Sequence, residues 1–116
     1  MISIIIPLYN REAFILRALR SFQNQCMEKI EIVFVDDCST DNSISLLKNF
    51  QKNDERIEVI KNIKNRGALT SRLIGAIYAK GEYIKFVDSD DILLPKLKMM
   101  YNIAKKNNID IIEHIF

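Results

Sequence analysis

Short apolar runs alternate along this chain with segments whose apolar residues recur every three or four positions. Continuous runs are typical of strands that are buried on both faces of a sheet, whereas the second spacing is typical of amphipathic helices. The runs predict five strands, over residues 2–7, 30–35, 57–61, 83–87 and 109–116. This alternation is the pattern expected of βα units.

The first two helices are predicted to follow the first two strands. Asn10 can cap the first helix, because its side chain can accept a backbone N–H, and that helix ends near Gln25. Ser39 or Thr40 can cap the second helix, whose apolar residues recur at helical spacing.

The other two helices are bounded by glycine and proline. The third follows a turn at Gly67, and Gly81 is expected to end it in the left-handed conformation. Pro95 suits the first turn of the last helix, which reaches about Asn107.

These elements predict an α/β protein, a three-layer α/β/α sandwich around a mostly parallel sheet, with residues 1–116 forming one domain. In such sheets ligands bind beyond the carboxyl ends of the strands. The segments after the first, second and fourth strands are therefore the first places to look for a site.

Composition narrows the class of protein. With 116 residues, 48% of them hydrophobic and 28% charged, the chain can form one globular domain. A net charge of +2 does not indicate a nucleic-acid partner. The chain has only two cysteines, Cys26 and Cys38, so we expect reduced thiols and no disulfide framework. We also find no secretory leader and no apolar run long enough to cross a bilayer. Together these features predict a cytoplasmic protein.

Aspartates gather after the strands, and like charges at one edge repel unless cations or hydrogen-bond donors accompany them. The six residues are Asp36, Asp37, Asp41, Asp88, Asp90 and Asp91.

Two of them have the spacing of a metal site. Asp88 and Asp90 are two positions apart, so in an extended segment both carboxylates can face one ion. Mg²⁺ and Mn²⁺ prefer such oxygen ligands. The structural alternative is a turn and helix cap, for which aspartate and serine are equally suited.

Asp36 and Asp37 also have two interpretations. They can belong to a cap of the second helix, or Asp37 can accept the imide N–H of uracil or a ribose hydroxyl. Cys38, which follows them, is expected to be a small buried residue.

Three blocks of the sequence resemble the signatures of family 2 glycosyltransferases. They are residues 3–10 (SIIIPLYN), 31–41 (EIVFVDDCSTD) and 81–91 (GEYIKFVDSDD), in the order and spacing of that family. The resemblance covers essentially the whole chain. It implies the GT-A fold and the transfer of a sugar from a nucleotide-diphosphate sugar to a glycan or lipid-linked acceptor, in bacterial polysaccharide synthesis.

The resemblance also implies roles for individual residues in a nucleotide-sugar site. Pro7 and Tyr9 match the loop that packs on the base, and Asp37 matches the carboxylate that reads uracil, with Asp36 as its neighbour in the site. Arg72 matches a basic position near the nucleotide.

The metal site and a second basic candidate follow from the same resemblance. Asp88-Ser89-Asp90 matches the DXD motif, in which Asp90 binds Mn²⁺ or Mg²⁺ directly and Asp88 lies near the ribose or the metal's water shell. Asp91 is a candidate to assist this pair, and Arg66 is a rival of Arg72 for the position near the nucleotide. A solvated surface charge is the alternative for each arginine.

The sequence departs from the family pattern at two positions. Cys38 stands where glycine is frequent, and Leu73 stands where asparagine commonly follows the arginine, which weakens the assignment of Arg72.

The family's general base lies well beyond the DXD motif, and we expect it beyond Phe116. Glu113 and His114 are given no role. The chain therefore resembles a donor-binding half that lacks its acceptor half, and we expect no sugar transfer from it alone.

Competing classes fit the pattern less well. A receiver-type signalling domain would need an acidic pair after the first strand, where Pro7-Leu8-Tyr9-Asn10 stands, and a nucleotidyltransferase would favour a glycine-rich loop there. A nucleotide-binding pseudoenzyme or interaction module stays open as an alternative.

Two kinds of association are also predicted. The last strand would be an exposed edge, so a homodimer through that edge or across an apolar patch is expected. The last helix carries Lys96, Lys98, Lys105 and Lys106. These lysines form either a solvated face or a peripheral contact with the inner face of the membrane.

Overall fold

The computed structural model describes residues 1–24, 29–89 and 97–110 of the chain. Within these ranges four strands and four helices alternate in the order that the apolar pattern predicts. They are β1 (Ile2–Leu8), α1 (Glu12–Gln23), β2 (Ile30–Asp36), α2 (Ser43–Asn53), β3 (Ile57–Lys61), α3 (Ala68–Tyr78), β4 (Tyr83–Phe86) and α4 (Leu97–Asn107). The fifth predicted strand falls largely on residues 111–116, which lie outside the described residues.

The four strands form one parallel sheet in the order β3-β2-β1-β4. Chain order and spatial order differ because the chain returns to the other side of β1 after β3, and this reversal is typical of doubly wound folds. The carboxyl ends of β1, β2 and β4 therefore lie at the same edge of the sheet.

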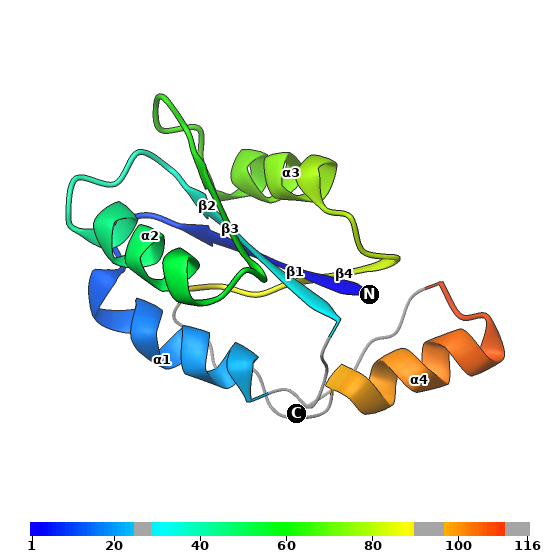
Figure 1. Ribbon diagram of the computed structural model, residues 1–116. Coiled ribbons are helices and arrows are strands. Elements are labelled where there is room, and N and C mark those ends of the chain that lie inside the picture. The colour runs from blue at the N-terminus through cyan, green and yellow to red at the C-terminus, as the bar shows by residue number, and fades with distance from the viewer. Residues whose placement is uncertain (25–28, 90–96, 111–116) are drawn as a thin grey trace.

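Helices cover both faces of this sheet, which confirms the predicted three-layer α/β/α sandwich (Figure 1). Residues of β1 alternate between the two faces. Ile4 and Ile6 are fully buried in the larger core with Phe22 of α1, while Ile5 lies in a smaller core beneath α3.

Gly75 allows α3 to lie close to the sheet. A Cβ at this position would stand 2.4 Å from Cγ2 of Ile5 and 3.1 Å from Cγ2 of Val35. Both of those side chains are fully buried and cannot move aside freely. Close contact between α3 and β1 therefore depends on the absence of a side chain at Gly75.

The predicted helix caps are wrong, because each proposed residue has a partner elsewhere. Asn10 is not the cap of α1, which is Arg11, and the cap of α2 is Asn42 rather than Ser39 or Thr40. Asn10 instead has a positive φ of 52° and binds the loop after β2.

Gly81 does not end α3 in the left-handed conformation, since Ala79 follows the helix with extended backbone. A Cβ on Gly81 would lie 2.7 Å from the backbone nitrogen of Ser3. Its N–H donates to the Ser3 hydroxyl, which in turn donates to the buried carboxylate of Glu31. Glycine is needed here because β1 passes so close.

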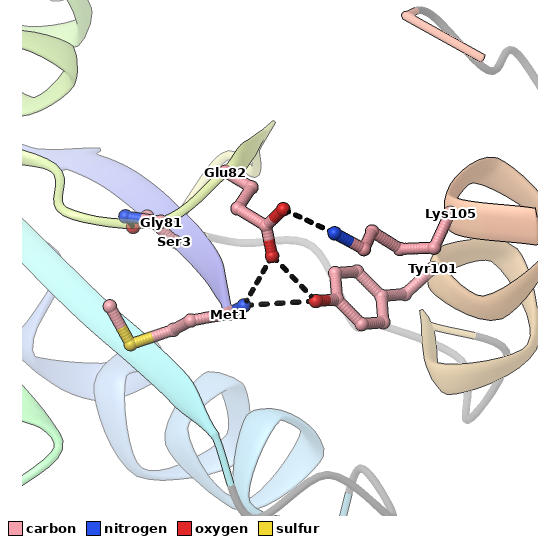
Figure 2. A network of polar contacts seen from close by, with 6 residues as sticks. All are labelled: Met1, Ser3, Gly81, Glu82, Tyr101 and Lys105. Carbon is pink, nitrogen blue, oxygen red and sulfur yellow. Dashed lines mark hydrogen bonds and ion pairs between the residues drawn. The ribbon is translucent and has the colours of Figure 1, made fainter. Parts of the chain in front are cut away.

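The C-terminal helix α4 is tied to the start of β4 by polar contacts (Figure 2). Glu82 accepts hydrogen bonds from the Met1 amine, the Tyr101 hydroxyl and Lys105. The bond from Lys105, followed by those from Tyr101 and the amine, lowers the pKa of Glu82 to about 2. The Tyr101 ring also meets Tyr83 edge-on, with 5.9 Å between the ring centroids.

Candidate functional site

A cleft of about 330 Å³ opens at the carboxyl edge of the sheet, beside the ends of β1 and β2. The cleft is lined by residues from the end of β1, from the segments after β1, β2 and β4, and from the first turn of α3. The lining residues are Pro7, Leu8, Tyr9, Arg11, Asp37, Ala68, Ser71, Asp88 and Ser89.

The cleft brings together four of the residues that the sequence singled out. Pro7 and Tyr9 come from β1 and the loop after it, Asp37 follows β2, and Asp88 follows β4. Tyr9 is 45% exposed, so its ring is available to a ligand. Two carboxylates and one aromatic ring thus face a common space, as expected for the edge where parallel strands end.

Asp37 is held by three hydrogen bonds from the segment between β3 and α3. Its Oδ1 accepts the side-chain amide of Asn62 at 3.0 Å and the backbone N–H of Arg66 at 2.7 Å. Its Oδ2 accepts the backbone N–H of Gly67 at 2.9 Å. These donors stabilise the buried negative charge of Asp37. Hydrogen-bond donors of this kind are one of the two ways in which the expected repulsion among the aspartates can be offset.

The pKa of Asp37 reflects two opposing influences. Burial raises the pKa, but the hydrogen bonds from Arg66, Asn62 and Gly67 together outweigh burial and place the pKa below its ordinary value of 3.8. Asp37 is therefore an ionised, acceptor-only group at neutral pH.

Asp88, which lines the cleft, is paired with Arg72 of α3. The Arg72 Nη2 lies 2.8 Å from Asp88 Oδ1, and the Asp88 side chain is 56% exposed. Arg72 itself does not line the cleft, so it reaches the site through Asp88. Arg66, the rival basic residue, contributes its backbone N–H to Asp37, while its side chain lies at the surface.

Asp36 is placed differently from its neighbour. It is fully buried and does not line the cleft. Its Oδ2 accepts the N–H of Ser39 at 3.0 Å, and its Oδ1 has no partner among the described residues. Asp36 is thus the last residue of β2, and its side chain binds the turn that follows the strand. Asp41 also serves local structure, accepting the N–H groups of Ser43 and Glu12.

Asn10 joins the loop after β1 to the loop after β2. Its Oδ1 accepts the backbone N–H of Thr40 at 2.8 Å, and its own N–H donates to the Ser39 hydroxyl at 2.9 Å. Tyr9 precedes Asn10, so these bonds also fix the loop that carries the exposed ring. Cys38 lies in the same region with φ of 63° and is only partly buried, so the expectation of a buried residue was wrong.

A divalent cation at this edge would find part of its ligand set. Oδ2 of Asp88 has no partner in the parts of the chain that the structure describes, so it offers a hard oxygen ligand. Asp90 and Asp91 lie outside the described residues. Among residues 1–24, 29–89 and 97–110 no three acidic, histidine or cysteine side chains converge on one point.

Sequence reasoning missed several residues of the site. Asn62 and Ser71 are buried polar residues next to Asp37, while Arg11 and Ser89 line the cleft. A polar residue directly after a strand was the available signal for Asn62, since the same criterion selected Asp37 and Asp88. Ser71 had no such signal, because a serine on a helix is ordinary.

The sheet order and the cleft together define a doubly wound α/β domain, in which ligands bind beyond the carboxyl ends of the strands. Residues 3–113 match the model of the family described as "Glycosyl transferase family 2". The chain belongs to that family.

Known proteins resemble the chain over most of its length. A poly(ribitol-phosphate) beta-glucosyltransferase of Bacillus spizizenii is 46% identical over 114 residues, which are 95% of this chain and 18% of that protein. The GalNAc(5)-diNAcBac-PP-undecaprenol beta-1,3-glucosyltransferase of Campylobacter jejuni is 37% identical, over 80% of this chain and 30% of that protein.

Among solved structures, S. aureus TarS 1-349 in complex with UDP-GlcNAc is similar at a TM-score of 0.85 and 31% identity. The similarity covers 92% of this chain and 32% of that one. The chain spans less than half the length of the curated relatives just named.

Proposed function

We propose that this chain binds the nucleotide of a nucleotide-diphosphate sugar, with a UDP-sugar as the donor, as part of a glycosyltransferase. The observation that carries the proposal is that Asp37 and Asp88 line one cleft where the parallel strands end. Family membership and the similarity to a structure that contains UDP-GlcNAc support the choice of ligand.

The residues around the cleft suit the two halves of such a ligand. Tyr9 offers an exposed aromatic face to a base, and Pro7 lies beside it. Ionised Asp37 can accept an N–H from the base, as uracil provides. Arg72, held at Asp88, puts a positive charge near the place for the diphosphate.

Asp88 and Asp90 would hold Mn²⁺ or Mg²⁺ together with phosphate oxygens. When bound, the cation would neutralise charge that develops on the leaving diphosphate. Asp88 would have to share its carboxylate between Arg72 and the ion, because Oδ1 is already bound to the guanidinium.

The reaction in this proposal is an inverting displacement at the sugar's anomeric carbon by an acceptor hydroxyl. A general base must lie within hydrogen-bond reach of that hydroxyl. No residue of the described cleft is assigned this role, and residues 113 and 114 lie outside the described part of the chain. We therefore propose that residues 1–116 form a donor-binding portion which does not transfer sugar alone.

The acceptor is proposed to be a glycan or a lipid-linked glycan of a surface polysaccharide, at the cytoplasmic side of the membrane. The names of the two relatives, which act on poly(ribitol-phosphate) and on an undecaprenol-linked glycan, support this class. No helix within the described ranges has the length and apolar character needed to cross a bilayer.

Peripheral contact with the membrane would involve α4, where Lys98 and Lys106 are exposed. Lys105 is engaged by Glu82 at 2.6 Å, and Lys96 lies outside the described residues. A homodimer would use β4, which is at the edge of the described sheet and exposes Ile84 and Phe86.

Calorimetric titration with uridine diphosphate and guanosine diphosphate, each with and without Mn²⁺, tests the central proposal. We expect uridine diphosphate to bind more tightly than guanosine diphosphate and to gain affinity when Mn²⁺ is present. Asp37→Asn should weaken the preference for uridine, whereas Asp88→Asn should weaken the effect of Mn²⁺.

Glu58→Gln, an exposed substitution on β3 away from the cleft, is the matched control and should behave as the parent chain. A parent chain that binds neither nucleotide, or whose affinity ignores Mn²⁺, would contradict the proposal.

A further inference from the structure

Of the hydrogen bonds that Asp37 receives from the described residues, only one comes from a side chain. Arg66 and Gly67 donate through the backbone, whereas Asn62 donates through Nδ2. Asp37 and Asn62 are each only 5% exposed, so water has little access to the contact between them. Such a contact sets the orientation of a carboxylate more firmly than a surface hydrogen bond does.

Asn62 is itself held in place from three directions. Its backbone N–H donates to the Asp36 carbonyl at 2.8 Å, which continues the pairing of β3 with β2. Its amide donates to Asp37 and, at 3.1 Å, to the hydroxyl of Ser71. Ser71 is fully buried in the first turn of α3, and it lines the cleft.

The amide group of asparagine has two hydrogens, and here both have acceptors. Asn62 therefore cannot rotate toward another partner without losing both bonds. Asn62 therefore connects Asp37 to α3, although Asp37 and this helix are distant in sequence.

Counting acceptor positions shows what this arrangement leaves for a ligand. An ionised carboxylate has about four lone-pair directions. On Asp37, the donors among the described residues occupy two directions of Oδ1 and one of Oδ2, which leaves one direction on Oδ2. Because Asp37 lines the cleft, that direction is available to a single N–H group of a bound base.

We infer that Asn62, anchored by Ser71, is a positioning residue that orients the Asp37 carboxylate so that Oδ2 receives the N–H of the nucleobase. This inference rests on the proposed function, since it assumes that a uridine nucleotide occupies the cleft. Asn62 acts through Asp37 and does not itself touch the ligand.

Two ligands separate this role from a general structural one. Uridine diphosphate has a base for Asp37 to contact, while inorganic pyrophosphate has only the diphosphate; both are titrated in the presence of Mn²⁺. For Asn62→Ala we expect the affinity for uridine diphosphate to fall by about tenfold. The reason is that a misoriented Asp37 loses its hydrogen bond to the base, and a bond to a charged group contributes about this much. The affinity for pyrophosphate should stay within about twofold, since that contact does not involve Asp37.

Two further variants complete the experiment, with circular dichroism to verify the fold of each. Ser71→Ala removes the anchor but leaves the Asn62–Asp37 bond, so a loss of about threefold in uridine diphosphate affinity is expected. Asn65→Ala alters an exposed asparagine of the same loop and should bind both ligands as the parent chain does. If Asn62→Ala fails to fold, Ser71→Ala provides the same comparison of ligands.

The outcomes are distinct. Unchanged uridine diphosphate affinity in folded Asn62→Ala, or in Ser71→Ala if that is the only folded variant, would overturn the inference. Equal losses for both ligands would also overturn it, because they indicate a structural role. If the parent chain does not bind uridine diphosphate at all, the proposed function fails and this inference fails with it.

Discussion

The guanidinium of Arg72 lies 2.8 Å from a carboxylate oxygen of Asp88 and so joins α3 to the segment after β4. The family resemblance implies a position near the nucleotide for Arg72, whereas in this structure its guanidinium binds the carboxylate that is expected to lie near a cation. The same contact neutralises Asp88 when no cation is bound. If a divalent ion binds Asp88 as proposed, Arg72 would compete with it for this carboxylate.

Replacing Arg72 should make this competition measurable. We expect Arg72→Met to raise the affinity for Mn²⁺ in the absence of nucleotide by about threefold, the scale of a partly exposed ion pair. Water-proton relaxation during a Mn²⁺ titration reports that affinity. Arg20→Met, an exposed arginine on α1, is the control and should leave it unchanged. A lower Mn²⁺ affinity in Arg72→Met would show that the two cations do not compete.

Asn10 permits a second prediction, because its side-chain hydrogen bonds and its left-handed backbone conformation contribute separately to the free energy of unfolding. Asn10→Gly removes the side-chain bonds to the loop after β2, keeps the backbone N–H bond to Ser39 and tolerates a φ of 52°, and should cost about 1 kcal/mol. Asn10→Ala removes the same bonds and adds the strain of a left-handed residue, about 1 kcal/mol more. Urea denaturation should rank stability as Asn, then Gly, then Ala; equal values for Gly and Ala would refute the strain component.

The contact of α3 with the sheet predicts the effect of a single methyl group. Gly75→Ala should lower the free energy of unfolding by about 2 kcal/mol, because the new Cβ would overlap Ile5 in a packed core. Alanine has a higher helix propensity than glycine, which by itself would stabilise the variant. A variant of equal or greater stability would therefore mean that the core adjusts to the new methyl group. Leu73→Ala, on the exposed face of the same helix, is the control, and both can be compared by urea denaturation.

Asp54 predicts how stability depends on pH. Hydrogen bonds from the Arg56 side chain, above all, lower the pKa of Asp54 from 3.8 to about 2. Because the folded-state pKa is depressed, the stabilisation is present above the unfolded value of 3.8 and is lost as the pH falls toward 2. After allowance for screening by water, we expect a loss of about 1 kcal/mol.

Asp54→Asn should remove this part of the pH dependence, while Glu55→Gln, its exposed neighbour, should retain it. Unfolding free energies measured between pH 5 and about pH 2 make the comparison. Parallel curves for Asp54→Asn and the parent chain would exclude Asp54 as the source.

Local patterns were sufficient for the elements and their arrangement in layers. The four described strands match the predicted runs within a residue or so, and the sheet is parallel as expected. The physical reason is that a strand buried on both faces must be apolar at nearly every position. Such a run can be recognised from a few consecutive residues of the sequence. The same logic placed Asp37 and Asp88 at one edge, because parallel strands end together.

The sequence by itself thus determined the α/β architecture and which carboxylates could meet. The tertiary structure alone decided what each polar residue binds. Asn10 meets Thr40, 30 positions away, and Gly81 meets Ser3, 78 positions away, so neither acts as the cap that its neighbours suggested. The donors that hold Asp37 likewise come from the segment between β3 and α3. Hydrogen bonds act over about 3 Å in space regardless of separation along the chain, and only the folded sheet brings these groups that close.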